Sequence, residues 1–334
     1  MTRPSTRYAL TKAERSVLQP LERACERGGW SLDLGLGGPT GTLEGEPLEE
    51  GDLFGVVNVP RDLAACAELE LKALRARGEL VHRVHVGETW DPFLAPLEVQ
   101  HIALEAMETL STHGVDLYLH TRAMLSRTVI ERLAAIQDRV RVILPFVSMR
   151  PDISAVWEPG AATPGERLRC ARALTSRGVR VAGRADPLLP LINDTQADIE
   201  EFCTAFSGTG MHRAAAAYLQ LTPERARAMS RVLSRMHRDV LKGCFVGRSW
   251  QQDEAGRSFK VLEPALRERG LRRFLEVAQK LGLAASVCGC REGDVLAGTC
   301  HDRMVGTPSR RMRPADKVQD VAGQLDFFGK KALA

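Results

Sequence analysis

The chain has 334 residues, of which 44% are hydrophobic and 26% are charged. This length allows two ordinary domains or one large barrel with attachments, and it excludes small disulfide-stapled scaffolds. The composition is that of a globule able to bury a large core, not of a disordered chain. The start of the chain has no apolar run typical of a signal peptide, and no segment has the ~18 apolar residues of a membrane span. We therefore expect a cytoplasmic protein with no membrane partner.

The net charge of +4 hides an asymmetry along the chain. Residues 1–210 carry 23 Lys and Arg against 29 Asp and Glu, whereas residues 211–334 carry 23 against 13. The basic C-terminal third predicts a surface that binds phosphate groups, such as those of a nucleic acid.

Two different patterns divide the chain near residue 55. Thr11 and Glu14 have the spacing of a capping box, which predicts a helix of about 17 residues ending at Gly28 and Gly29. Residues 30–55 are rich in Gly and acidic residues and predict a long loop. We expect segment 242–261 to be an insertion loop and residues 303–334 to be a basic tail. The predicted parts are therefore 1–55, a barrel over 56–302, and the tail 303–334.

From residue 56 onwards, short β-branched runs alternate with amphipathic stretches. The predicted strands are 56–59, 80–86, 115–120, 140–146, 179–183, 215–221 and 284–288, and the predicted helices are 61–77, 97–112, 127–136, 164–177, 195–206, 223–237 and 264–281. Gly78, Gly114, Gly178 and Gly282 each follow a predicted helix, where a left-handed residue ends the last turn. This alternation predicts parallel βα units in a full or partial barrel. An open doubly wound sheet is the alternative.

Nearly every predicted strand ends in chemically active side chains. In a parallel barrel these ends form the mouth of the active site. Arg122 and Arg184 at these ends can bind a carboxylate or a phosphate through their guanidinium groups. His82 and His85 differ in strand parity, so they point to opposite faces and cannot chelate one metal as a pair. The residues at the ends are Glu88, Thr89, Asp91, His120, Arg122, Ser148, Arg150, Arg184, Asp186, Gln220, Cys288 and Cys290.

Two stretches carry a resemblance to a known family. Residues 157–168, WEPGAATPGERL, are followed by ALTSRGVRVAGRADPLLPLIND up to residue 194. Residues 84–93, VHVGETWDPF, are followed by Glu98. Both stretches, with Asn58-Val59-Pro60 before them, resemble the spore photoproduct lyase-like radical SAM family of DNA-repair photolyase homologues. The resemblance implies an α/β fold, a partial (β/α)6 TIM-like barrel of the radical SAM type. We predict cofactor contacts at Glu88, Thr89, Asp91, Ser148, Glu158 and Arg184.

The motif that defines the enzymes of this family is missing. In the family, a CxxxCxxC loop after the first strand binds a [4Fe-4S] cluster, and S-adenosylmethionine binds its fourth iron. That loop should lie between residues 30 and 55, and the chain has no cysteine between Cys25 and Cys66. We therefore predict a degenerate member that does not cleave S-adenosylmethionine. As an enzyme, the chain would need an accessory metal site of its own or a cluster-bearing partner subunit to supply electrons or a radical.

A second group of cysteines lies near the end of the predicted barrel. Cys288, Cys290 and Cys300, with His301 or Cys244 as a fourth ligand, predict an iron-sulfur or zinc site. The alternative is that Cys288 packs in the core and the other two are free thiols.

Two further patterns predict macromolecular partners. Gln324, Leu325, Phe327 and Phe328 resemble the peptide that docks on the bacterial sliding clamp, and the alternative is an aromatic patch that folds back on the barrel. Arg227, Arg231, Arg235 and Arg238 share one face of a predicted helix. This stripe predicts a track for nucleic-acid phosphates, and the alternative is a solvated surface.

Two functions from different classes fit these observations. The first is a radical-SAM-fold protein in nucleic-acid repair or modification that has lost its first cluster and keeps an accessory metal. The second is a barrel hydrolase or lyase for a small anionic substrate, with Glu88, Asp91, His120 and Asp186 as acid-base groups.

Overall fold

The computed structural model describes residues 7–13, 16–21, 29–34, 56–88, 90–245, 247–252, 258–292 and 294–296. Its strands are β1 (Arg7–Thr11), β2 (Leu18–Pro20), β3 (Trp30–Leu32), β4 (Val56–Pro60), β5 (Arg83–Val86), β6 (Asp116–His120), β7 (Val140–Phe146), β8 (Arg180–Leu188), β9 (Arg213–Tyr218), β10 (Gln251–Gln252), β11 (Ser258–Phe259) and β12 (Ala284–Val287). Its helices are α1 (Leu63–Ala76), the 3-10 turn η2 (Pro92–Leu94), α2 (Leu97–Thr112), α3 (Arg127–Ala135), α4 (Pro151–Trp157), α5 (Pro164–Thr175), α6 (Gln196–Ser207), α7 (Pro223–Val232), α8 (Arg235–Phe245), α9 (Pro264–Lys280) and α10 (Gly289–Glu292).

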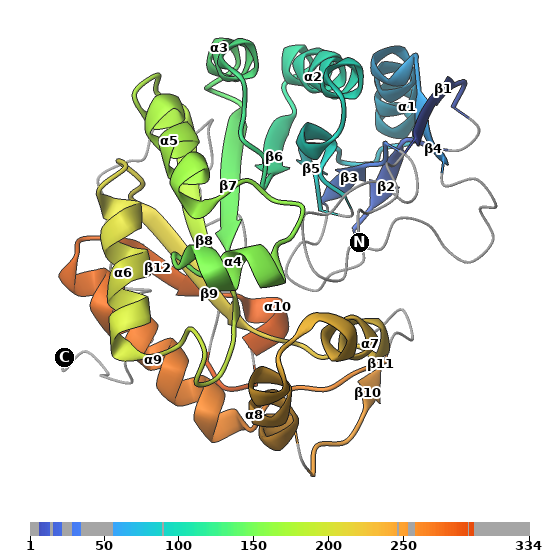
Figure 1. Ribbon diagram of the computed structural model, residues 1–334. Coiled ribbons are helices and arrows are strands. Elements are labelled where there is room, and N and C mark those ends of the chain that lie inside the picture. The colour runs from blue at the N-terminus through green and yellow to red at the C-terminus, as the bar shows by residue number, and fades with distance from the viewer. Residues whose placement is uncertain are drawn as a thin grey trace, which may run out of the picture.

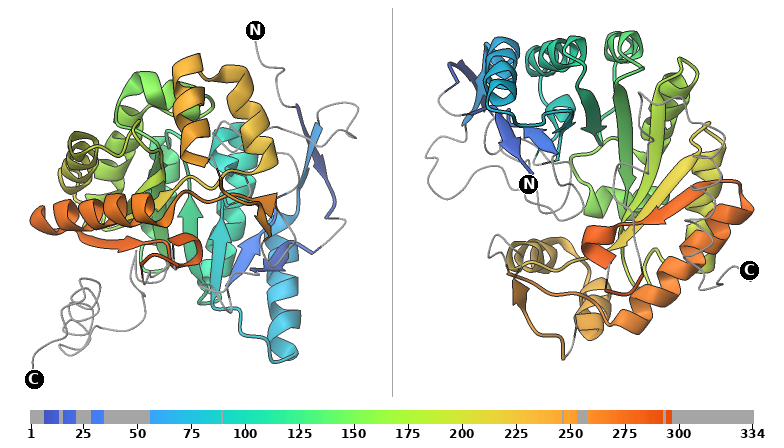
Figure 2. Two further views of the ribbon diagram at one scale, coloured as in Figure 1. Left: turned by 90° about the horizontal axis from the view of Figure 1, so that it is seen from below. Right: turned by 180° about the vertical axis from the view of Figure 1, so that it is seen from behind.

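The central feature is an eight-stranded sheet in the order β12-β9-β8-β7-β6-β5-β3-β2. All neighbouring pairs from β12 to β3 are parallel, and only β2 pairs antiparallel with β3. Helices α1, α2, α3, α5, α6 and α9 cover its outer side, and the sheet curves from β2 at one edge to β12 at the other (Figure 1 and Figure 2). This arrangement is the predicted partial TIM-like barrel.

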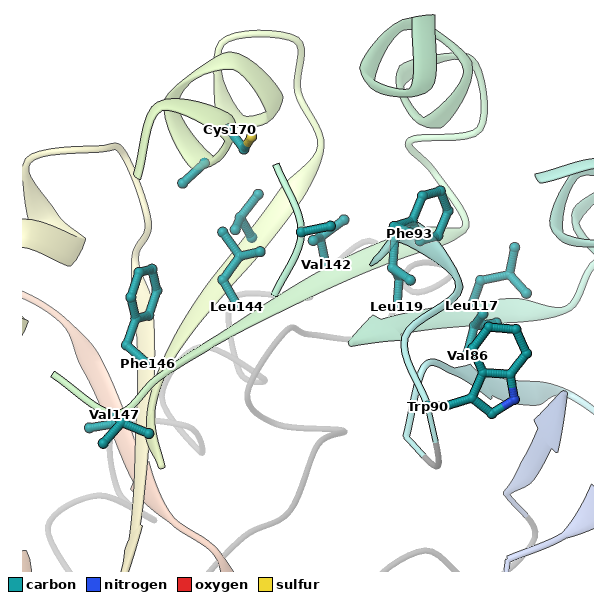
Figure 3. Packing of buried hydrophobic residues seen from close by; sticks show 14 of the residues in the cluster. Val86, Trp90, Phe93, Leu117, Leu119, Val142, Leu144, Phe146, Val147 and Cys170 are labelled. Carbon is teal, nitrogen blue, oxygen red and sulfur yellow. The ribbon is translucent and has the colours of Figure 1, made fainter. Parts of the chain in front are cut away.

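The core lies between the sheet and the outer helices. Every residue of β7 is buried, as expected for a central parallel strand that is covered on both faces. Figure 3 shows Val86, Leu117 and Val142 from successive strands packed with Trp90 and Phe93, which precede α2. The large buried apolar surface on this side holds the strand ends in fixed positions.

Local sequence signals explain where the helices begin and end. Thr163 caps α5 in a complete capping box with Glu166, and Pro164 takes the first helical position. Gly114 follows α2 with a φ of 77°, and Gly178 follows α5 with a φ of 79°. Both glycines lie where the sequence predicted helix ends, because this backbone conformation strains other residues.

The prediction of a helix from about residue 11 to residue 28 was wrong in the part of it that the structure describes, residues 11–13 and 16–21. Arg7–Thr11 is not the entry to a helix but a strand, which pairs in parallel with β4 in a separate two-stranded sheet. Leu18–Pro20 is also a strand. The Glu70 carboxylate accepts hydrogen bonds from the backbone N–H groups of Val17 and Leu18 at 2.9 Å, which holds this segment extended against α1.

The first of the parallel strands of the central sheet lies within the segment predicted to be a loop. Trp30–Leu32 forms β3, which pairs in parallel with β5, whereas the strand predicted at 56–59 is β4 and pairs outside this sheet. In the segment 242–261, α8 continues to Phe245, and β10 and β11 form an antiparallel pair, so it is not a plain loop. Among the described helices, none has the length and apolar character needed to cross a membrane.

Candidate functional site

The polar side chains that the sequence singles out gather where the parallel strands end. The carboxyl ends of β5 to β9 and β12 point toward α4, α7 and α10, which lie at this edge of the sheet (Figure 1). Active sites in parallel barrels are built at this edge, because the loops that leave the strands meet there. We call the side chains at this edge the barrel mouth.

Glu158, at the C-terminal end of α4, is a buried carboxylate that accepts several hydrogen bonds. Its carboxylate accepts hydrogen bonds from Arg122 Nε at 2.9 Å, Arg167 Nη1 at 2.9 Å, Ser154 Oγ at 3.2 Å and the Val147 N–H at 3.3 Å. Burial opposes its ionisation, but the guanidinium groups of Arg167 and Arg122 outweigh burial and hold the pKa of Glu158 below its usual value. This predicted cofactor-binding carboxylate thus joins the ends of β6 and β7 to α4 and α5.

Asp91 makes a similar connection between neighbouring strands. Its side chain accepts hydrogen bonds from the Phe93 N–H at 3.0 Å, Thr121 Oγ1 at 2.8 Å and the Arg122 N–H at 2.7 Å. Burial raises its pKa to about 6, against the lowering effect of these donors. The contacts hold the loop after β5 against the end of β6.

A line of charged side chains crosses the mouth from β8 to α10. Asp186 contacts two arginines through different oxygens: its Oδ2 lies 2.8 Å from Arg184 Nε, and its Oδ1 accepts a hydrogen bond from Arg291 Nη1 at 2.7 Å. Burial opposes its ionisation, but Arg184, Arg291 and Arg122 together lower its pKa. Asp186 is therefore ionised at neutral pH, and it orients two guanidinium groups that can contact an anion.

His85, Glu88 and His120 form a compact cluster at the ends of β5 and β6. His85 Nδ1 lies 3.3 Å from His120 Nε2, and Glu88 Oε1 lies 3.8 Å from the first nitrogen and 3.6 Å from the second. The His85 side chain is fully buried, while His120 and Glu88 are 8% and 7% exposed. Two imidazoles and a carboxylate at these distances can bind a metal ion or exchange protons.

The sequence reasoning considered His85 only together with His82 and so missed this cluster. His82 is exposed and His85 is buried, in agreement with their opposite strand parity. The partner of His85 comes from the next strand, where His85 lies opposite Tyr118 and His120 is two residues further along. Residues two apart on a strand share a face, so the signal was present in the alternation of β6.

Comparison with solved structures identifies the fold. The chain aligns with spore photoproduct lyase complexed with dinucleoside spore photoproduct at a TM-score of 0.65 and 13% identity, over 84% of this chain and 81% of that chain. A mutant of the same lyase with bound AdoMet and dinucleoside spore photoproduct gives 0.65 and 13% over the same shares. The chain has the fold of spore photoproduct lyase. A scan against protein-family models and a comparison with curated sequences found no match.

On this spore photoproduct lyase fold, the donor set does not fit the [4Fe-4S] cluster of radical SAM enzymes. The sequence between the end of β3 at Leu32 and the start of β4 at Val56 contains no cysteine. Carboxylate oxygens are poor substitutes for the thiolates that such a cluster requires. This segment therefore supplies no thiolate ligand for such a cluster.

The remaining predicted site residues divide into those that are described and those that are not. Ser148 is buried and accepts a hydrogen bond from the Arg150 N–H at 3.1 Å. Cys288 is buried at the end of β12 and packs against Ala217. The predictions for Thr89, the Cys290 side chain, Cys300, His301, Gln324, Leu325, Phe327 and Phe328 lie outside the described residues.

The arginine stripe lies on two helices and not on one, which corrects the prediction of a single helix over 223–237. The backbone turns extended at Leu233, with φ −76° and ψ 145°, and ends α7. Ser234 Oγ then accepts the His237 N–H at 3.2 Å and so supports the first turn of α8. Arg227 and Arg231 therefore lie on α7, while Arg235 and Arg238 lie on α8.

Proposed function

We propose that the chain is a nucleic-acid-binding protein of repair or modification that uses the spore photoproduct lyase fold without cleaving S-adenosylmethionine. This proposal depends on one observation: the alignment with spore photoproduct lyase covers 84% of the chain, yet the sequence between β3 and β4 contains no cysteine. The structures that it resembles hold a dinucleoside spore photoproduct, so a nucleotide or oligonucleotide is the ligand class that we propose.

Positive charge near the mouth supports a phosphate-bearing ligand. Helices α7 and α8 follow β9 and lie beyond the carboxyl ends of the strands (Figure 1). The side chains of Arg227 and Arg235 are 69% and 91% exposed, and Arg231 is exposed as well. Exposed arginines beside a mouth that contains Arg184 and Arg291 can contact the phosphates that flank a bound base.

The first experiment tests the lost reaction. Purified protein is reconstituted anaerobically with iron and sulfide, reduced with dithionite and incubated with S-adenosylmethionine. We expect no 5′-deoxyadenosine above a protein-free control. Stoichiometric formation of 5′-deoxyadenosine by the purified chain would overturn this part of the proposal.

The second experiment tests nucleic-acid binding by fluorescence anisotropy with a labelled oligonucleotide at several salt concentrations. Affinity should fall steeply with salt, and Arg231→Ala/Arg235→Ala should reduce the slope of log K against log salt by about 2. The matched control is Arg127→Ala/Arg169→Ala, which removes two exposed arginines from the outer helices α3 and α5. Equal losses in both variants, or no binding by the wild type, would refute a nucleic-acid surface on α7 and α8.

A second candidate function is a barrel hydrolase or lyase for a small anionic substrate, favoured by the mouth itself. Glu88 lies 3.6 Å from His120, a separation suited to proton transfer after a small movement. Arg184, which forms an ion pair with Asp186 at 2.8 Å, can bind an anion. Asp91 is a weaker acid-base candidate because its oxygens accept three hydrogen bonds within the fold. Thermal stabilisation by a phosphate ester or carboxylate that is lost in Arg184→Gln would favour this function over the first.

A further inference from the structure

The cluster of His85, Glu88 and His120 has the dimensions of an occupied metal site. A tetrahedral zinc ion with ligands at 2.0–2.1 Å places those ligands about 3.3 Å apart. The three separations in the cluster are 3.3, 3.6 and 3.8 Å, so the donor atoms need to move by a few tenths of an ångström or less. All three separations are close to the spacing that one shared tetrahedral ion would impose on its ligands.

The fold brings these donors together by a specific backbone device. Gly87 lies between His85 and Glu88 with a φ of 85°, and a Cβ at this position would lie 2.1 Å from the carbonyl oxygen of His120. Only glycine allows the end of β5 to approach the end of β6 so closely. The Tyr118 ring stacks on His85 at a centroid distance of 5.0 Å and orients its imidazole.

The chemistry of the donors selects the class of ion. Imidazole nitrogens favour zinc, iron, copper and nickel, whereas magnesium and calcium prefer oxygen ligands. Two histidines and one carboxylate occur in catalytic zinc sites and in iron(II) sites that keep positions open for water or substrate. The cluster lies at the barrel mouth, where an open position can face a substrate.

We propose that His85, Glu88 and His120 bind one divalent transition metal ion at the mouth of the barrel. The proposed site uses none of the cysteines at 288, 290 and 300, and it does not depend on nucleic-acid binding. A metal ion held here supplies a Lewis acid, which polarises a phosphoryl or carbonyl oxygen or lowers the pKa of a bound water.

The test is a zinc titration of full-length protein stripped with EDTA, in the presence of a competing chelator. To separate the two sites, the titration is done in a Cys288→Ala/Cys290→Ala/Cys300→Ala background, with circular dichroism to confirm folding. We expect one zinc per chain in this background. His85→Gln/His120→Gln and Glu88→Gln should each lower the zinc affinity by about 100-fold or more, since even the loss of outer-shell partners costs 10–100-fold.

The matched control removes two histidines that lie away from the cluster. His82 is exposed, and His113 Nε2 lies 3.1 Å from Glu68 on α1, so His82→Gln/His113→Gln should bind zinc as the parent does. If the cysteine background does not fold, cobalt(II) spectra of the otherwise wild-type chain replace the titration. The site is supported if the protein shows cobalt(II) absorption bands with no thiolate charge-transfer band, and if these bands are absent in His85→Gln/His120→Gln.

Three results would overturn the proposal. The first is the absence of bound zinc or cobalt both in the Cys288→Ala/Cys290→Ala/Cys300→Ala chain and in the otherwise wild-type chain. The second is an unchanged affinity in the His85→Gln/His120→Gln variant, and the third is an equal loss of affinity in the His82→Gln/His113→Gln control. None of these readouts uses nucleic acid or S-adenosylmethionine. Failure of the metal site is therefore distinguishable from failure of the proposed function.

Discussion

Replacement of the Glu158 carboxylate by an amide should remove a large part of the stability of the chain. The side chains of Glu158 and Arg167 are both 0% exposed. In Glu158→Gln one carboxylate oxygen becomes an N–H donor that faces other donors, and the Arg167 charge stays buried without its counter-ion. Arg122 is 18% exposed and can recruit water, so the loss comes mainly from Arg167.

The size of the effect follows from what remains around Arg167. Its Nη1 also donates a hydrogen bond to the backbone oxygen of Pro145, but this oxygen is neutral and does not replace the negative charge of Glu158. Breaking a buried ion pair by removing one partner costs about 3–5 kcal/mol of unfolding free energy. Because a typical domain has about 5–15 kcal/mol in total, the variant should be marginally folded.

Guanidinium chloride denaturation, followed by circular dichroism, measures this loss as a lower midpoint at an unchanged slope. The double variant Glu158→Leu/Arg167→Met removes both charges and should lose at least about 2 kcal/mol less than the sum of the single variants. Glu131→Gln, on the surface pair with Arg127, is the control and should show no measurable shift. A loss below about 1 kcal/mol in Glu158→Gln, or additive losses in the double variant, would refute the reasoning.

Three further predictions concern the same framework. Asp91→Asn places an amide donor against the Arg122 N–H and should lower the unfolding free energy by about 1–3 kcal/mol in urea denaturation, whereas an unchanged midpoint would remove the connecting role of Asp91. Gly270→Ala puts a Cβ 1.6 Å from the Tyr218 hydroxyl, so α9 or the buried Tyr218 ring must shift. Calorimetry should show a lower melting temperature with a loss of about 1–3 kcal/mol, and wild-type melting would contradict this. The pKa of Glu158 in the folded state lies below its usual 4.5, so the stability that its ionised form contributes is present above pH 4.5 and is lost as the pH falls through the folded-state pKa. The difference in unfolding free energy between wild type and Glu158→Gln should therefore shrink in this acid range. A difference that stays constant with pH would contradict this prediction.

Much of the fold could be predicted because the signals are local. The helix at Leu97–Thr112 has the bounds that the sequence predicted, and the strand at Val140–Phe146 does as well. Apolar periodicity and the glycines at helix ends depend only on nearby residues, so they can be read without tertiary contacts. The same is true of the order of strands and helices from residue 56 onwards, which indicated a parallel barrel.

The N-terminal strands could not be predicted in this way. Arg7–Thr11 is a strand because it pairs with β4, about 50 residues away, and the next segment is held by the Glu70 carboxylate. The capping-box spacing at Thr11 favours a helix locally, but partners distant in the sequence override it. Trp30–Leu32 likewise becomes the first parallel strand of the central sheet only through its pairing with β5.

The candidate site shows the same division. The amino-acid sequence by itself determined that polar residues end the strands and that no thiolate lies between Cys25 and Cys66, since both statements depend only on residue order. The tertiary structure alone decided which of these residues meet: it enclosed Glu158 between two arginines and brought His85 and Glu88 to His120. The physical reason is that strand register and the close approach at Gly87 act between neighbouring strands, and chain order does not specify these distances.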